Sequence, residues 1–324
     1  MLTLIAYPRI HVTLIDLGHA TLRANGGAGF ALDGLPLMIS ARTGARDLVS
    51  LPRDFDCAAH DDIEMAVGRM RKVFEFPPTL IGVATSAPQH VGLGTKTCAV
   101  LGTLQATACL HGIGASRSDI QRLSGRGGTS GVGISTFFTG GFIADAGHPR
   151  CHRSYTPSSS APPAAPPPVN VQMRMPNEWI CHLILPQGFR RAGVDEAAFF
   201  RKNTPIESES ALQVLSAVYH GICPAVASAD LDLFRTALLQ ISEIGFKRRE
   251  VMAQPPELAA LLHRLNRDPA LAAGMSSMGP LVYVVGAGDR GESARGEIEG
   301  ICAAFEAKYL GAYPFRNAGF EVER

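Results

Sequence analysis

The hydrophobic pattern of the first half of the chain predicts strands that alternate with helices. Residues 2–17 hold two runs of alternating apolar residues separated by Pro8, which is typical of two short strands. Between 61 and 76, apolar residues recur at intervals of three or four, the spacing of an amphipathic helix. Further strands are predicted at 35–42 and 79–87, and further helices at 97–111 and 116–125.

The second half continues this mixture. The stretch GISTFFTGGFIADAGH (133–148) predicts a hairpin of two strands around Gly140 and Gly141. The run WICHLILP (179–186) predicts a buried strand with Trp179 in the core. The charged run FKRRE (246–250) predicts a solvated helix face. Helices are also predicted at 208–221, 230–250, 256–267 and 291–308, and a last strand at 280–287.

A proline-rich stretch divides the chain. Residues 151–168 contain six prolines and four serines, a composition that does not form a packed element and is typical of a loop or linker. We therefore expect two α/β units, at 1–168 and 169–324, in a chain of 324 residues.

Composition and charge exclude several classes of protein. A formal net charge of +1 argues against a nucleic-acid-binding protein. The seven cysteines form no CxxC pair, which favours a reducing compartment over a disulfide framework. No uninterrupted apolar run reaches about 18 residues and the N-terminus lacks the pattern of a signal peptide, so we expect a cytoplasmic protein with no membrane span.

A glycine-rich turn before the predicted helix at 97–111 is the first candidate site. In PQHVGLGTKT (88–97), unpaired N–H groups at a helix N-terminus favour an anion, and the nearby lysine adds a positive charge. The spacing is neither GxxxxGK[ST] nor GxGxxG, and a turn without a ligand is the alternative interpretation. The residues predicted to bind phosphate are Gly92, Leu93, Gly94, Thr95, Lys96 and Thr97.

Three further clusters of glycine, most of them with hydroxyl residues, lie at 24–29, 125–133 and 274–280. Such flexible segments lose much entropy on folding, so their number favours a ligand that docks among them, and a substrate with several phosphates fits best. The candidate substrate-binding residues in them are Asn25, Gly26, Gly27, Gly127, Gly128, Thr129, Ser130, Gly131, Ser276 and Ser277.

Four other side chains are candidates for chemistry. Arg9 and His11 lie two positions apart on a predicted strand and so face one side, although His11 is also compatible with a satisfied core histidine. Arg126 adds a cation to the second glycine cluster. Asp145 follows a predicted strand, where it either caps a turn or weakly suggests a metal ligand.

The stretches PRIHVTLIDLG, PQHVGLGTKT and GMSSMGPLVYVV resemble, in order and spacing, the three motifs of the GHMP kinase superfamily. Within it, NGGAGFAL, GRGGTSGVGISTFFTGGFIADAGH, PPPVNVQMRMPNEW and ICPAVASADLDLF are similar to the β-ribofuranosylaminobenzene 5′-phosphate synthase family. The resemblance implies an α+β, GHMP-kinase-like fold of two domains. The N-terminal domain would be like domain 2 of ribosomal protein S5, and the C-terminal domain ferredoxin-like.

The resemblance also implies a reaction. Members of that family condense 5-phosphoribosyl 1-pyrophosphate with 4-aminobenzoate, releasing pyrophosphate and carbon dioxide, in tetrahydromethanopterin biosynthesis. It further implies Mg²⁺, no use of ATP, small-molecule substrates as partners and a homodimer. On this basis Lys96, Arg126 and His11 are the predicted catalytic residues: the 92–97 loop and Lys96 hold pyrophosphate, and Arg126 holds the 5′-phosphate or the aryl carboxylate.

Two alternatives remain open from the sequence. The first is an ATP-dependent GHMP-family small-molecule kinase; Gly133 stands where many superfamily kinases carry an aspartate, and a glycine neither accepts a proton nor holds magnesium. The second is a catalytically silent paralogue that binds a phosphate ligand. The chain also departs from the narrower family pattern at Asn25, at 95–98 and at Met275, which leaves the aromatic acceptor open.

Overall fold

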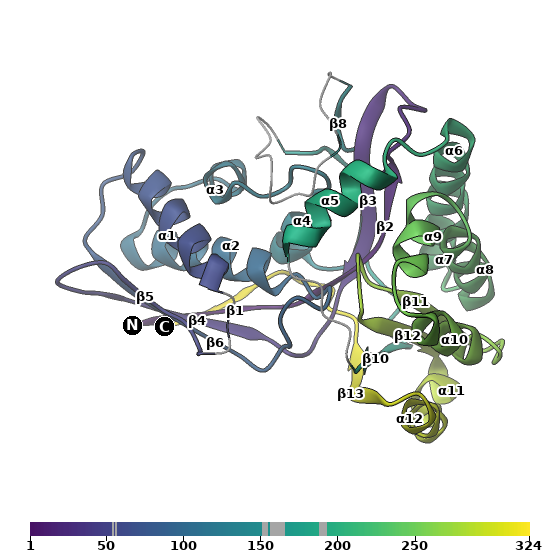
Figure 1. Cartoon of the computed structure of the whole chain (residues 1–324). Helices are drawn as coiled ribbons and strands as arrows, with labels where there is room; N and C mark the ends of the chain where they lie inside the picture. The colour runs from purple at the N-terminus through teal and green to yellow at the C-terminus, as the bar shows by residue number, and fades with distance from the viewer. Residues whose placement is uncertain (54, 56, 151–154, 156–165, 188–192) are drawn as a thin grey trace.

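The computed structural model describes all residues except 54, 56, 151–154, 156–165 and 188–192. Most of the predicted linker therefore lies outside the described residues. Three sheets and the helices packed on them form the fold, which agrees with the α+β class expected from the sequence (Figure 1).

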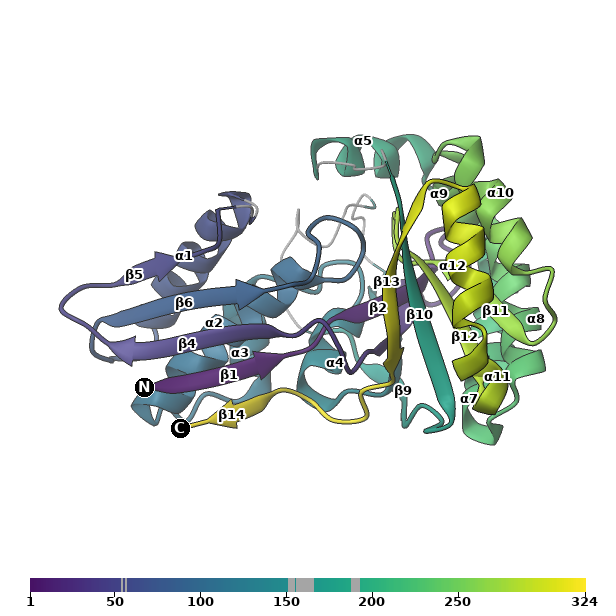
Figure 2. The same cartoon turned by 90° about the horizontal axis from the view of Figure 1, so that it is seen from below.

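The first sheet carries helices on one face. Its strands follow the order β14-β1-β4-β6-β5, antiparallel except for the parallel pair β5 and β6. In Figure 2 the helices α1 and α2 run along the same side of this sheet. The bounds are β1 Leu2–Ala6, β4 Leu37–Thr43, β5 Leu48–Ser50, β6 Thr79–Thr85, β14 Glu321–Glu323, α1 Cys57–Arg71, α2 Thr95–His111, α3 Arg117–Ser124 and α4 Val132–Thr139.

The second sheet, in the order β2-β3-β7-β9 with β8 paired to β3, lies between the two ends of the molecule (Figure 1). The third, in the order β11-β12-β10-β13, carries the C-terminal helices. The strands are β2 Arg9–Asp16, β3 Arg23–Ala31, β7 Phe142–Asp145, β8 His148–Pro149, β9 Val169–Met173, β10 Trp179–Pro186, β11 Leu271–Met275, β12 Val282–Ala287 and β13 Ala307–Pro314. The helices are α5 Gly193–Asn203, α6 Ser208–Ala217, η1 Val218–Ile222, α7 Cys223–Ser228, α8 Leu231–Ser242, α9 Gly245–Met252, α10 Pro256–Leu265, α11 Gly288–Ser293 and α12 Arg295–Ala304.

Most predicted elements are confirmed, but three interpretations were wrong. The stretch predicted as the first strand of a hairpin is the helix α4. The glycine cluster at 24–29, interpreted above as a flexible segment, lies within the strand β3. The run FKRRE lies in α9, yet Lys247 and Glu250 are buried instead of solvated. The strands that were not predicted are β3, β5, β9, β11, β13 and β14.

The sheets do not divide at the predicted linker. The strand β9 follows it but pairs with β7, and the last strand, β14, pairs with β1. Two strands of the predicted second unit thus complete sheets of the first. The division into units at 1–168 and 169–324 stays a prediction.

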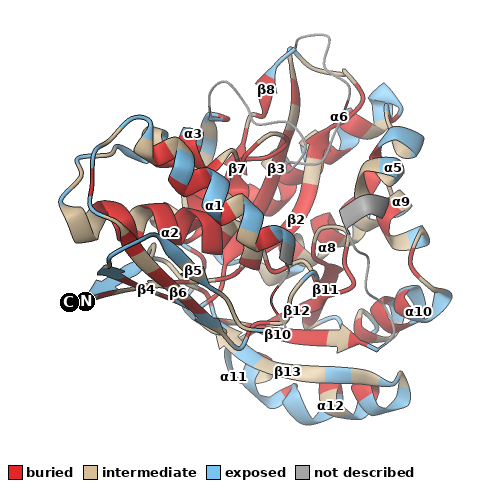
Figure 3. Ribbon diagram, turned by 60° about the vertical axis from the view of Figure 1, so that its left-hand side comes forward, coloured by how far each residue is buried: buried red, intermediate tan, exposed pale blue. Residues whose placement is uncertain are grey.

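Buried residues of all three sheets pack into a common core (Figure 3). The largest apolar core contains Leu4 of the first sheet, Phe30 of the second, and Trp179 and Tyr283 of the third, all fully buried. Ser208–Ser228 is the one helical stretch of the described residues long and apolar enough to cross a membrane, and half of its apolar window is buried inside the fold.

Candidate functional site

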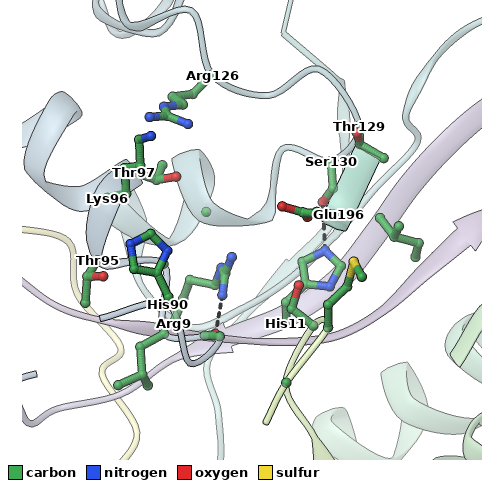
Figure 4. A pocket seen from close by; sticks show the side chains of 18 of the residues that line it. Arg9, His11, His90, Thr95, Lys96, Thr97, Arg126, Thr129, Ser130 and Glu196 are labelled. Atoms are coloured by element: carbon green, nitrogen blue, oxygen red, sulfur yellow. Dashed lines mark hydrogen bonds between the residues drawn. The ribbon is translucent and has the colours of Figure 1, made fainter. Parts of the chain in front are cut away.

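A cavity of about 530 Å³ opens where α2, the second sheet and α5 meet. It is lined by residues from three of the four glycine clusters, together with Arg9 and His11 of β2 (Figure 4). The 92–97 and 274–280 segments, expected to face one cleft, both line it. A volume of this size is typical of a site for a small molecule.

The loop before α2 is shaped by close backbone contacts. Gly92 has φ 106°, and a Cβ there would lie 2.5 Å from the carbonyl oxygen of Ser276. Gly94, with φ 71°, is the N-cap of α2 and offers no side chain to the first-turn N–H groups. Six consecutive residues, from Gly92 to Thr97, line the cavity at this helix N-terminus. This arrangement suits an anion, as the sequence predicted.

Two cations meet at one side of the cavity. Lys96 Nζ and Arg126 Nη2 each lie 2.7 Å from the same carboxylate oxygen, Oδ2 of Asp62 in α1. Figure 4 shows the two cationic side chains pointing toward each other. The structure thus brings together two predicted catalytic residues from distant segments. Sequence reasoning missed Asp62, whose only signal was its place in a predicted helix.

The central part of the cavity is a chain of hydrogen bonds that runs into the protein. His11 Nε2 lies 3.3 Å from Ser130 Oγ, and Ser130 Oγ donates to Asp145 Oδ2 at 2.8 Å. The hydroxyl of Ser130 donates its proton to Asp145, so in the contact with His11 it accepts a hydrogen bond from Nε2–H. In the neutral imidazole, Nδ1 then carries no proton and is an acceptor. Burial, together with Arg9 and Lys247, lowers the pKa of His11 well below its usual value. His11 is therefore neutral at neutral pH.

Asp145 has a structural role that its sequence position did not reveal. It is fully buried, and its carboxylate accepts hydrogen bonds from Ser130 Oγ and from the backbone N–H groups of Gly131, Gly147 and Gly27. Burial raises the pKa of Asp145 to about 6, although these hydrogen bonds lower it. Asp145 is not one of the residues that line the cavity. We therefore assign it the role of organising the 127–131 loop, in place of the metal ligand that the sequence weakly suggested.

The fourth glycine cluster supports the site from behind. Gly27 allows close packing, because a Cβ there would lie 2.5 Å from Ser130 Oγ and 2.7 Å from His11 Nε2. Gly26 donates its N–H to the carbonyl of Thr129 at 3.1 Å. The predicted residues that do not line the cavity are Asn25, Gly26, Gly27, Gly128, Gly131 and Ser276; those that do include Gly127, Thr129, Ser130 and Ser277.

Ser276 ties three segments together. Its hydroxyl donates to the carbonyl of Gly92 at 2.8 Å and accepts from the N–H of His11 at 3.1 Å. Arg9 Nη1 also donates to that carbonyl, at 2.5 Å, while Arg9 Nε is buried and has no hydrogen-bond partner among the described residues. Ser276 is fully buried, so it positions the loop instead of touching a ligand.

A buried ion pair underlies the 274–280 segment. Lys247 Nζ lies 2.6 Å from Glu250 Oε2 and donates to the carbonyls of Met275 at 3.3 Å and Ser277 at 3.0 Å. The lysine is 2% and the glutamate 4% exposed. Glu250 lines the cavity, and burial raises its pKa to about 7 although Lys247 opposes the shift.

One further carboxylate and an apolar group complete the cavity. Glu196 of α5, half-buried, lies among the cations; burial raises its pKa, whereas Arg9, Lys96 and Arg126 lower it. Leu14, Phe200 and Met278 also line the cavity and pack with the apolar cluster beside β2. Neither feature was predicted, because α5 reaches the site only through the tertiary fold.

The Glu250→Gln variant is expected to change the pH dependence of stability. The folded-state pKa of about 7 lies above the usual 4.5, so the folded protein holds this proton more tightly than the unfolded chain. Glu250 therefore contributes most stability below about pH 4.5, and this contribution is lost as the pH rises through about 7.

Urea unfolding between about pH 5 and about pH 8 measures this effect. Stability should fall less with rising pH in the variant than in the parent protein. The pKa of Asp145 is also raised, and Asp145 is present in both proteins. The stability of the variant should therefore still fall somewhat as the pH rises. Parallel curves for the two proteins would contradict the expectation.

Comparison with known proteins gives a consistent result. No family model matches the chain. It is 33% identical over 285 residues to the β-ribofuranosylphenol 5′-phosphate synthase of Archaeoglobus fulgidus, covering 88% of each chain. It is 30% identical over 283 residues to the synthase of the same name from Methanothermobacter thermautotrophicus, covering 86% of each. The homoserine kinase of Cytophaga hutchinsonii has the same fold, with a TM-score of 0.72 over 99% of this chain and 97% of the kinase at 14% identity.

Proposed function

Because this chain belongs to the family of β-ribofuranosylphenol 5′-phosphate synthases, we propose that it is a phosphoribosyl-type transferase. It condenses 5-phosphoribosyl 1-pyrophosphate with an aryl carboxylic acid to a C-riboside 5′-phosphate, in tetrahydromethanopterin biosynthesis. The observation that carries this proposal is the two-sided cavity. An anion-binding side at Lys96 and Arg126 and an apolar group at Met278 line one space, as a polyphosphate donor and an aromatic acceptor require.

The proposed reaction breaks and forms bonds in two steps. The ring carbon that bears the carboxylate bonds to C1 of the ribose, while the bond from C1 to the diphosphate oxygen breaks and diphosphate leaves with the electron pair. The bond from the ring to the carboxylate then breaks, its electron pair restores the aromatic ring, and carbon dioxide leaves. No net proton transfer is needed up to this point, which suits a cavity whose histidine is neutral.

The residues act mainly through charge and orientation. Lys96, Arg126 and the first-turn N–H groups of α2 stabilise the leaving diphosphate. The apolar side chains Leu14, Phe200 and Met278 hold the acceptor ring against the ribose. His11 offers Nδ1 as an acceptor for a hydroxyl group, and Ser130 fixes its ring. Glu196 faces the same space and suits the ribose hydroxyls.

The acceptor is an aryl acid whose other ring substituent is to be tested. The family resemblance noted from the sequence concerns an aminobenzene product, whereas the relatives' name specifies a phenol. A hydroxybenzoate and an aminobenzoate of the same geometry have the same carboxylate and differ only in this substituent. The assay below therefore compares both.

Magnesium, the homodimer and the cytoplasmic location remain proposals. The described residues contain no group of three or more His, Cys, Asp or Glu able to hold a metal. Magnesium commonly keeps most of its waters and binds substrate phosphates through one or two carboxylates, and Glu196 is a cavity carboxylate able to contribute. Bound in this way, it would neutralise charge on the diphosphate. Size-exclusion chromatography tests the dimer.

The kinase alternative rests on the fold. Gly133 lines the cavity, and a Cβ there would lie 3.6 Å from both Arg9 Nε and Thr97 Cγ2, so a side chain at this position would enter the site. The chain places no carboxylate there, which supports a reaction without a general base at this position. We therefore expect no use of ATP.

The test uses the purified protein, Mg²⁺, phosphoribosyl pyrophosphate and carboxyl-labelled acceptor. We expect equimolar pyrophosphate and labelled carbon dioxide, with either 4-hydroxybenzoate or 4-aminobenzoate as the better substrate. Product that keeps the label would overturn the reaction, as would phosphate transfer from ATP to a small molecule. Binding of the donor without turnover would identify a silent paralogue.

Met278→Ala is expected to raise KM for the acceptor by about threefold to tenfold, because burying each methylene contributes about 0.8 kcal/mol. KM for the donor should stay unchanged, since the side chain lies with the apolar group and not with the cations. Steady-state kinetics with each substrate varied separately measure this. Met252→Ala, at an exposed position of α9, is the control; an equal rise in both KM values would place the acceptor ring elsewhere.

A further inference from the structure

Asp62 occupies a position that the proposed reaction does not explain. It lies in α1, and one oxygen, Oδ2, contacts both Lys96 Nζ and Arg126 Nη2 at 2.7 Å. The cations come from separate segments, the first turn of α2 and the loop after α3. Their side chains are 27% and 9% exposed, and that of Asp62 is 29% exposed. The contact is therefore partly shielded yet open to the cavity.

The location of Asp62 allows a ligand to replace it. Ala58 lies one helical turn before Asp62 on the same face of α1, and Ala58 lines the cavity. The carboxylate thus approaches the cations from the cavity rim. Asp62 offers the two cations a single negative charge, whereas a diphosphate carries several and therefore attracts them more strongly.

We propose that Asp62 is an internal counter-ion that holds Lys96 and Arg126 in the free protein and competes with diphosphate for them. This inference rests on the proposed function for the identity of the anion. Diphosphate binding moves the two cations from Asp62 to phosphate oxygens. When diphosphate is the product, Asp62 takes the cations back and favours its release.

If Asp62 instead positions the two cations for the ligand, the change in diphosphate affinity on its removal has the opposite sign. If Asp62 only held the two cations in place for the ligand, its removal would free them and weaken diphosphate binding. If it competes, its removal abolishes both the competing contacts and the repulsion between carboxylate and phosphate. The direction of the change in affinity therefore distinguishes the two.

The experiment is calorimetric titration of inorganic pyrophosphate into the parent protein and its Asp62→Asn variant. We expect the variant to bind about threefold to tenfold more tightly, the effect of removing partly exposed ion pairs that compete with the ligand. Asp61→Asn, a change of the same charge at the neighbouring exposed position, should leave affinity unchanged. Pyrophosphate should also inhibit turnover more strongly in Asp62→Asn than in the parent.

Unchanged or weaker binding by Asp62→Asn would overturn the inference, as would absence of pyrophosphate binding in both proteins. An equal gain in Asp61→Asn would do so too, because it would show a general charge effect. Thermal unfolding confirms that each variant is folded, and Asp62→Ser repeats the titration if asparagine disturbs α1. The titration measures binding without turnover. Its result can therefore be interpreted even if the proposed reaction is wrong.

Discussion

Lys96→Ala is expected to lower kcat/KM for the phosphoribosyl donor by about 10²-fold or more, the usual cost of removing a charge contact made in the transition state. The side chain lies at the N-terminus of α2, beside Arg126 and Asp62, where the proposed diphosphate leaves. Steady-state kinetics and single-turnover rates with the donor measure the loss.

Two variants control this result. Lys96→Arg keeps the charge and should retain more activity than the alanine variant, while Lys72→Ala removes an exposed lysine just after α1 and should be neutral. Unchanged kinetics for Lys96→Ala would show that the loop acts through its backbone N–H groups alone.

Lys247→Met is expected to reduce the free energy of unfolding by about 3–5 kcal/mol, because it leaves Glu250 buried without its cation. The variant also loses the hydrogen bonds from Lys247 Nζ to the carbonyls of Met275 and Ser277. Urea unfolding at pH 8, above the pKa of about 7 that Glu250 has beside Lys247, measures the loss.

The double variant Lys247→Met with Glu250→Gln should recover part of this stability, since no buried charge then remains. Arg248→Met, an exposed neighbour in α9, should change stability little. A loss for Lys247→Met no larger than that of Arg248→Met would mean that the ion pair contributes nothing net.

The sequence predicted those elements whose own residues determine their structure. The alternating apolar run of β10 and the glycine-rich start of α2 were identified because local pattern and backbone chemistry suffice there. The helix α4 was predicted as a strand because its β-branched and aromatic residues favour strands. In the fold its N-terminus is held by Asp145 and Ser130, and its packing overrides that preference.

The site was predicted in part for the same reason. Glycine clusters and their cations are visible in sequence, and the cavity gathers most of them. Asp62, Glu196 and the Lys247–Glu250 pair were missed, since each lies on a helix where charged residues ordinarily face solvent. Only the packing of α1, α5 and α9 around the cavity turns these side chains inward.

The pairing of β14 with β1 bears on how the protein is made. In the described part of the chain, one edge of β1 pairs with residues 321–323, and Phe315 similarly bridges to Leu32. During synthesis from the N-terminus, the first strand therefore waits for the last one before its sheet is complete. Contacts so distant in sequence slow folding and leave a strand edge open to wrong pairing meanwhile. Until residues 321–323 have been synthesised, this edge of β1 therefore stays available to other strands.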